Sequence, residues 1–285
     1  MLTLSQWLSR ILPIALLAAI FLISFMKVNQ SSNHRWRYLI SALAFIWAID
    51  IAVFTVAKLA YILATDIPTL LADLTTIRSF LVQVRMGQML LLQLVIALVI
   101  ALTSQLIRTK QGFKYLALIT MIGILPPALT GHSGNTANHE LAVTTWMIHI
   151  LSISIWISLV AAILFIIIFD NSNTSANIQT VSRLSMACFI GTFLSGSVNA
   201  WIRMPDISSL FTSQYGQILI TKILIFVFIG LLATIYRLKI LSSLEINSKL
   251  FIRLLATELA LMGLAVMFGV LLSETKFPIV KVVPN

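Results

Sequence analysis

Charged residues are scarce in this sequence. Asp, Glu, Lys and Arg make up 10% of the 285 residues, hydrophobic residues make up 59%, and the mean hydropathy is +1.02. An ordinary soluble domain carries about 25% charged residues. This shortage excludes a water-soluble surface, and the hydrophobic runs recur from end to end without leaving room for a soluble catalytic domain. We therefore predict a single transmembrane domain over residues 1–285.

Cysteine and several catalytic motifs are also missing. Cys188 is the single cysteine, which excludes an intrachain disulfide and a CxxC metal or redox site. No Walker loop, GxSxG or HExxH motif is present, so the chain is not expected to hydrolyse ATP or to be an enzyme. The net charge of +10 does not indicate nucleic-acid binding, because the basic residues lie in short loops between hydrophobic runs.

Long hydrophobic runs are what the sequence has instead. A helix needs roughly 20 mostly apolar residues to span a bilayer. The predicted fold class is all-α, a polytopic membrane bundle of about eight transmembrane helices in contact with lipid. The expected spans cover residues 8–26, 38–64, 86–107, 114–131, 141–169, 180–203, 217–236 and 252–273. We find no long linker and no convincing internal repeat.

The basic residues in the loops predict the orientation, because cytoplasmic loops carry an excess of Lys and Arg. One side has eleven, namely Lys27, Arg35, Arg37, Arg108, Lys110, Lys114, Arg183, Arg237, Lys239, Lys249 and Arg253. The other has six, namely Arg10, Arg78, Arg85, Arg203, Lys276 and Lys281. We expect the first side to be cytoplasmic. Both termini and the loops around 65–85, 131–140 and 203–216 are then extracytoplasmic.

Ionisable side chains within spans are costly and usually face a bundle interior or a watery cavity, so each is a functional candidate. They are Asp50, Lys58, His149, Lys222 and Glu258. For Lys58 we prefer an ammonium that extends to the interface. Lys222 either does the same or pairs with Asp206. Asp50 and Glu258 are either proton-handling groups or structural hydrogen-bond partners.

Three of the four histidines, His132, His139 and His149, are expected near the outer mouth of the bundle. Imidazole suits copper, zinc, iron and nickel, and thioether sulfur, as in Met147, favours Cu(I). His139 and His149 are ten residues apart, about 15 Å along a helix, which favours a relay of sites over one shared site. The alternatives are solvated loop histidines at 132 and 139 and a His149 that hydrogen-bonds a neighbouring helix.

Several motifs carry a resemblance to a known family. They are RMGQ at 85–88, GHS at 131–133, HILSISIWI at 149–157, SRL at 182–184, GSVNAWIR at 196–203, YGQILITK at 215–222 and ELA at 258–260. In order and spacing they resemble the copper resistance protein D family from about residue 80 onward. Two departures are ISL at 157–159, where the family has glycines, and RLK at 237–239 in place of an arginine-rich run.

The resemblance implies a multi-pass protein of the bacterial inner membrane that moves copper from periplasm to cytoplasm, often with a separate periplasmic copper chaperone. It implies His132, His139 and His149 as copper ligands, with Asn199 and Lys222 as motif residues. Met147, Asp50 and Glu258 are supporting candidates. The oxidation state of the copper stays open, and a copper cation near Lys222 would be repelled unless that lysine is paired or neutral.

Two other functions remain open. The first is a membrane haem protein for electron transfer, since two histidines on facing helices can ligate haem. Only His149 is clearly placed within a span for that role. The second is a membrane partner that binds copper without transporting it, which the sequence does not distinguish from a transporter.

Overall fold

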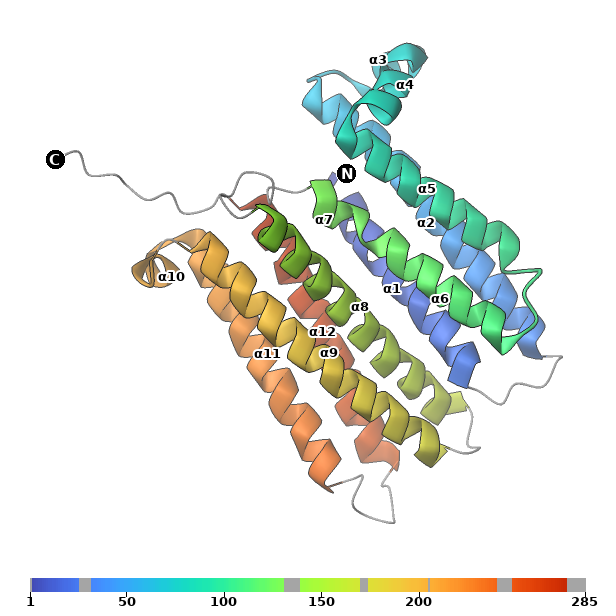
Figure 1. Ribbon diagram of the computed structural model, residues 1–285, viewed down its shortest axis with the longest axis vertical. Helices are drawn as coiled ribbons and strands as arrows, with labels where there is room; N and C mark the ends of the chain where they lie inside the picture. Colours follow the sequence, from blue (N-terminus) through green and yellow to red (C-terminus); the bar gives the residue numbers. More distant parts are fainter. Residues whose placement is uncertain are drawn as a thin grey trace. The chain divides into compact units, whose positions relative to one another are not determined.

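A computed structural model describes residues 2–25, 32–130, 139–169, 174–204, 206–239 and 248–275, and their regular secondary structure is entirely helical (Figure 1). Seven of these helices are long and apolar enough to cross a membrane. The predicted all-α polytopic bundle is therefore confirmed. By its internal contacts the chain divides into two compact units, unit 1 (Met1–Asn135) and unit 2 (Thr136–Asn285).

Unit 1 contains four long helices and three short ones. The long ones are α1 (Leu2–Phe25), α2 (Ser32–Ile62), α5 (Arg85–Thr103) and α6 (Lys110–Ile124), and the short ones are α3 (Ile67–Ala72), α4 (Leu74–Gln83) and α7 (Pro126–Thr130). α1 packs against α2 and α6, and α5 packs against the same two helices. The four long helices therefore form a closed ring of contacts.

The predicted span at 114–131 differs from what the structure shows. α6 ends at Ile124, and Pro126 and Pro127 begin the separate helix α7. Proline lacks a backbone N–H and its ring clashes with the preceding helical turn, so the helix breaks at Leu125. The 15 residues of α6 reach about 22 Å at the standard helical rise, less than the ~30 Å hydrocarbon core.

The short helices α3 and α4 were not predicted. Asp66 caps α3 by accepting a hydrogen bond from the Thr69 N–H, and Asp73 caps α4 by accepting one from the Thr76 N–H. Hydrogen bonds from the hydroxyls of Thr75 and Thr76 lower the pKa of Asp73 to about 2. Because a carboxylate with a depressed pKa keeps its charge above that value, this cap persists down to acidic pH.

Unit 2 repeats the order of unit 1. Its helices are α8 (His139–Phe169), α9 (Thr174–Arg203), the short α10 (Ser208–Thr212), α11 (Gln214–Lys239) and α12 (Ser248–Glu274). α8 packs against α9 and α12, and α11 packs against α12. Each unit thus has two long helices, a short helical segment, and two further long helices. This internal repeat was not recognised in the sequence.

One packing contact distinguishes the two units. In unit 1 the second and third long helices, α2 and α5, pack closely along their lengths, whereas the corresponding α9 and α11 of unit 2 make few contacts. The space between α9 and α11 is therefore where unit 2 opens.

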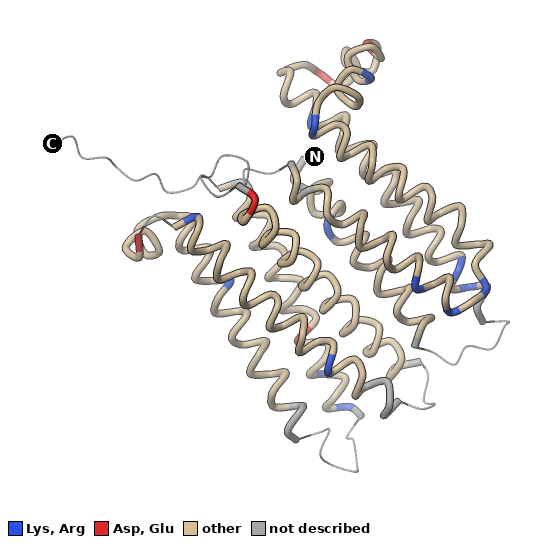
Figure 2. Tube along the Cα trace, viewed as in Figure 1, with Lys and Arg blue, Asp and Glu red and all other residues tan. Residues whose placement is uncertain are grey.

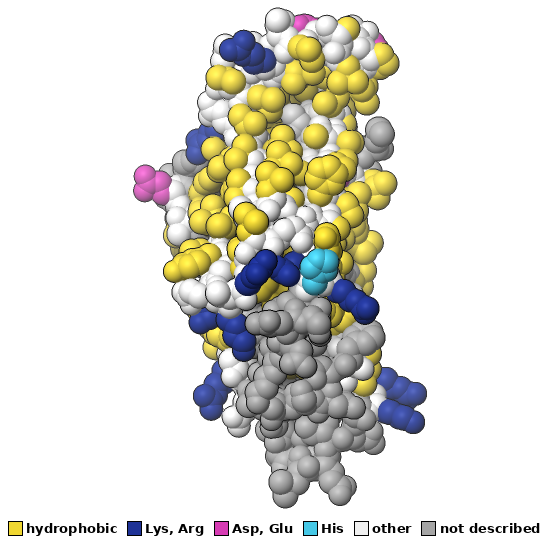
Figure 3. Space-filling view, turned by 90° about the vertical axis from the view of Figure 1, so that its right-hand side faces the viewer, with side chains coloured by type: hydrophobic (Ala, Val, Ile, Leu, Met, Phe, Trp, Pro, Cys, Tyr) yellow, Lys and Arg dark blue, Asp and Glu magenta, His cyan; other side chains and the backbone are white. Residues whose placement is uncertain are grey.

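The surface chemistry agrees with a membrane environment. Hydrophobic side chains cover a broad area of the face in Figure 3, and the exposed residues of α2 include Phe45, Ile46, Ile49 and Val53. Lys and Arg lie mostly near helix ends (Figure 2). The Arg37 guanidinium donates to the Gln105 carbonyl, 3.0 Å away, which places two of the basic segments at one end of unit 1.

A glycine near the start of α11 permits a close backbone approach. The short helix α10 folds back onto α11, and a Cβ at Gly216 would overlap the carbonyl oxygens of Ser209 and Leu210. Gly87 on α5 has the same relation to the carbonyl of Phe80 on α4. The YGQ and RMGQ motifs therefore serve the same structural purpose in the two units.

We expect Gly216→Ala to destabilise the protein by about 1–3 kcal/mol, because backbone atoms must move to admit the methyl group. Thermal unfolding in detergent measures the effect. Gly263→Ala on α12 is the matched control, since a Cβ there meets no atom within 4 Å and alanine favours helix. Equal melting temperatures for both variants would contradict the prediction.

Candidate functional site

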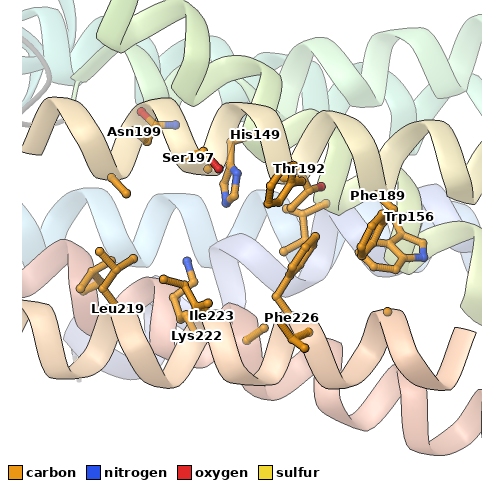
Figure 4. A pocket seen from close by; sticks show the side chains of 18 of the residues that line it. His149, Trp156, Phe189, Thr192, Ser197, Asn199, Leu219, Lys222, Ile223 and Phe226 are labelled. Carbon is orange, nitrogen blue, oxygen red and sulfur yellow. The ribbon is translucent and has the colours of Figure 1, made fainter. Parts of the chain in front are cut away.

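Unit 2 contains a cavity of about 620 Å³ in the space between α9 and α11, with further walls from α8 and α12 (Figure 4). Its lining is mainly hydrophobic and aromatic. The strongly polar side chains on it are His149, Asn199, Arg203, Tyr215 and Lys222, and no Asp or Glu is among the lining residues. Small-molecule sites usually occupy roughly 300–1,000 Å³, so this volume can hold more than a bare ion.

His149 on α8 turns its ring into this cavity (Figure 4). Its Nδ1 lies 3.2 Å from the Ser195 Oγ, and that hydroxyl is 2.5 Å from the Gly191 carbonyl oxygen. A serine hydroxyl has one hydrogen. Because Ser195 donates it to Gly191, its oxygen can accept an Nδ1–H from His149, and the ring also hydrogen-bonds the backbone of Thr192. In the tautomer with the proton on Nδ1, the neutral imidazole has its free lone pair on Nε2, a form in which histidine ligates metals.

The position of the His149 ring depends on its neighbours on both sides. A Cβ at Gly196 on α9 would lie 3.3 Å from the Cε1 of the ring, so glycine leaves the imidazole the room it occupies. Trp146 stacks on the ring with a centroid distance of 5.7 Å and an interplanar angle of 9°. Two rigid surfaces thus fix the orientation of the imidazole, which is what a metal ligand requires.

Arg203 lines the cavity from the last turn of α9. Its guanidinium carbon is 4.9 Å from the centroid of the Trp146 ring, a cation–π contact. The Tyr215 side chain also interacts with it. Trp146 therefore contacts both the Arg203 guanidinium and the His149 ring.

Asn199 joins α9 to α8. The Thr145 Oγ lies 3.2 Å from the Asn199 Oδ1, while the buried Asn199 Nδ2 has no hydrogen-bond partner among the described residues. An unsatisfied buried donor is costly. Asn199 therefore holds the two helices together and leaves one donor beside the cavity.

Lys222 faces His149 across the cavity from α11 (Figure 4). It is eight residues after Gln214, about 12 Å along the helix. A Cβ at Gly269 would lie 3.5 Å from its Nζ, so the ammonium rests close to the backbone of α12. The proposed pairing with Asp206 is not observed, because that carboxylate caps α10 by accepting from the Ser209 N–H and the Ser208 hydroxyl.

Aromatic residues line the deeper part of the cavity. Phe189 and Phe226 stack with a centroid distance of 4.6 Å, and Trp156 meets Phe189 edge-on at 5.5 Å. Met186 is the thioether on the lining, and Met147 is not part of it. The ionisable side chains on the lining therefore gather toward the C-terminal end of α9 and the N-terminal half of α11, while Thr234 adds a hydroxyl further along α11.

The structure places the other candidate residues elsewhere. His132 and the side chain of His139 lie outside the described residues, although α8 begins at His139 and runs unbroken through His149. Asp50 is in unit 1, where the Ser5 hydroxyl donates to its Oδ1 at 2.8 Å. Glu258 is fully buried on α12 away from the cavity lining. Within the described residues no three His, Cys, Asp or Glu side chains cluster as a metal site.

The sequence analysis did not identify Ser195 and Trp146 as site residues, and it did not predict that Arg203 lines the cavity. One signal for them was available. Ser195, Asn199 and Arg203 recur every four residues, which places them on one face of α9, and Trp146 and His149 are three residues apart on α8. Which of these faces meet each other could only be found from the packing.

Comparisons with known proteins point the same way. The copper resistance protein D model matches residues 178–272, and the copper resistance protein D-like N-terminal domain model matches residues 1–140. The copper transport protein CutJ of Bacillus subtilis (strain 168) is 29% identical over 131 residues, covering 44% of this chain. That match spans only 24% of the length of CutJ. No solved structure matches the chain.

Proposed function

Because the chain belongs to the copper resistance protein D family, we propose that it carries copper ions across the bacterial inner membrane, from periplasm to cytoplasm, through the cavity of unit 2. It is a multi-pass membrane protein of a copper resistance family, not of an enzyme class. The carrying observation is His149, whose imidazole ring points into a cavity of about 620 Å³ (Figure 4), large enough for a hydrated or ligated ion.

The proposed route begins at the extracytoplasmic end. His132 and His139 capture copper near the mouth, and His149 receives it about 15 Å further along α8 by the helical rise. Ser195 holds the imidazole in the metal-binding tautomer and Trp146 supports its plane. Met186 adds a thioether to the cavity lining, and sulfur ligands favour Cu(I). A separate periplasmic chaperone is the proposed copper donor.

Cellular copper content tests the direction of transport. A deletion strain that expresses the protein should accumulate more copper than the same strain with an empty vector, in proportion to the amount of protein in the membrane. Lower copper in the expressing strain would contradict import and indicate export. Equal copper in the two strains would support the alternative of a copper-binding partner that does not transport.

A haem held by two histidines, the alternative considered from the sequence, needs them on facing helices. In the described part of the unit 2 cavity, His149 is the single histidine. Copper therefore fits these residues better than haem. The absorption spectrum of the protein purified from haem-replete cells checks this, and a Soret band at one haem per chain would contradict the copper assignment.

A further inference from the structure

We infer that the unit 2 cavity contains an anion subsite between His149 and Lys222, and that copper occupies the cavity as a complex with a small anionic ligand, a halide or a carboxylate. This inference rests on the proposed copper function and specifies the form in which the ion is carried. A halide and a carboxylate share a negative charge and a lone pair that can bind the metal.

The charge of the cavity is the first reason. Arg203 and Lys222 both line it, and each acts electrostatically on the other residues there, including His149. No acidic side chain is on the lining, and the Lys222 ammonium has no ion pair or hydrogen bond with a described residue. A bare copper cation at the His149 Nε2 would therefore be repelled by two positive charges inside a weakly screening environment.

The hydrogen-bond inventory is the second reason. Among the described residues that line the cavity, His149 supplies an imidazole lone pair, whereas Lys222 and Arg203 supply only N–H donors. Donors of this kind recognise anions. The buried Nδ2 of Asn199, which has no partner in the described structure, adds a further donor at the same end.

The positions of His149 and Lys222 bring the metal-binding imidazole and the positively charged N–H donors together. His149 and Lys222 point toward each other from α8 and α11 across the cavity (Figure 4). An anion held at the Lys222 ammonium could donate a lone pair to a copper ion on the His149 Nε2. The anion would neutralise the added charge and complete the coordination that one imidazole cannot provide. The volume of about 620 Å³ leaves room for both partners.

Copper affinity measured in different salts tests the inference. The purified full-length protein in detergent is titrated with Cu(I) anaerobically, and with Cu(II) in air, against a chromophoric chelator in chloride, acetate or methanesulfonate at equal ionic strength. We expect copper to bind about tenfold or more tightly in chloride or acetate than in weakly coordinating methanesulfonate. The reason is that the anion offsets the repulsion between the positive charge of Lys222 and the copper ion. A gain in chloride alone identifies a halide, and a gain in acetate alone identifies a carboxylate.

Variants of Lys222 separate the anion effect from the metal ligand. Lys222→Met should bind copper more tightly than the wild type in methanesulfonate and lose the gain from chloride or acetate, while Lys222→Arg should keep it. Lys58→Met is the matched control, because Lys58 is an intramembrane lysine of unit 1 whose ammonium lies 5.7 Å from the Tyr61 ring. Its salt dependence should equal that of the wild type.

Copper K-edge X-ray absorption gives a readout independent of affinity. In chloride, the spectrum should contain a chlorine scatterer beside an imidazole nitrogen if the halide is the ligand. Tight copper binding of equal affinity in all three salts would overturn the anion subsite and leave the proposed function intact. Absence of copper binding in every salt would overturn the proposed function itself, and the anion subsite with it.

Discussion

His149→Ala should lower the copper affinity of the purified protein by at least about 100-fold, since loss of a partner that merely orients a ligand already costs roughly 10–100-fold. The imidazole ring points into the unit 2 cavity, and within the described residues no second His, Cys, Asp or Glu lines that cavity. Competition with a chromophoric chelator measures the affinity.

His34→Ala is the matched control for this prediction. His34 lies in the first turn of α2 in unit 1, is exposed, and contacts Tyr38 edge-on with a centroid distance of 4.4 Å. Its replacement should leave the copper affinity unchanged. If His149→Ala binds copper as tightly as His34→Ala, the copper site lies elsewhere.

Ser195→Ala should lower the copper affinity by roughly 10–100-fold, the usual range for an orienting partner of a metal ligand. Without the hydroxyl, the Nδ1 of His149 loses its side-chain partner at 3.2 Å. Although Trp146 still holds the plane of the ring, the proton is then less strongly held on Nδ1 and can move to Nε2. Chelator competition again gives the affinity, and nitrogen-15 chemical shifts of labelled histidine report the tautomer directly.

Ser195→Thr separates this tautomer effect from a packing defect. It retains a hydroxyl that can donate to the Gly191 carbonyl, as Ser195 does at 2.5 Å, and still accept from His149. Its copper affinity should lie close to that of the wild type. Full affinity in Ser195→Ala would show that the hydrogen bond does not control the ligand.

The sequence predicted the helical membrane fold because hydrophobic runs follow directly from the thickness of the bilayer. It did not predict the break at Leu125, where two successive prolines interrupt an otherwise apolar run. The short helices α3, α4 and α10 have 5–10 residues each, too few for the hydropathy of a membrane span to detect them. The repeat between the units is one of helix order and packing.

The candidate site was predictable in part. His149, Asn199 and Lys222 were singled out as polar groups in the outer halves of their spans, and all three line the cavity. Their neighbours depend on which helix faces meet, and a sequence does not contain that information. Asp50 and Glu258 satisfied the same sequence criterion, yet they lie in unit 1 and away from the cavity lining respectively.

The opening between α9 and α11 explains why unit 2 carries the proposed site. The corresponding helices α2 and α5 of unit 1 pack closely. The two units therefore share a helical plan, and the looser packing of one helix pair provides the cavity.

Copper uptake by proteoliposomes that contain the wild type or His149→Ala at matched protein density tests the central claim most directly. The wild type should take up copper well above the rate of protein-free liposomes, and the variant should fall to that background rate. Uptake by His149→Ala at the wild-type rate would contradict transport through the unit 2 cavity.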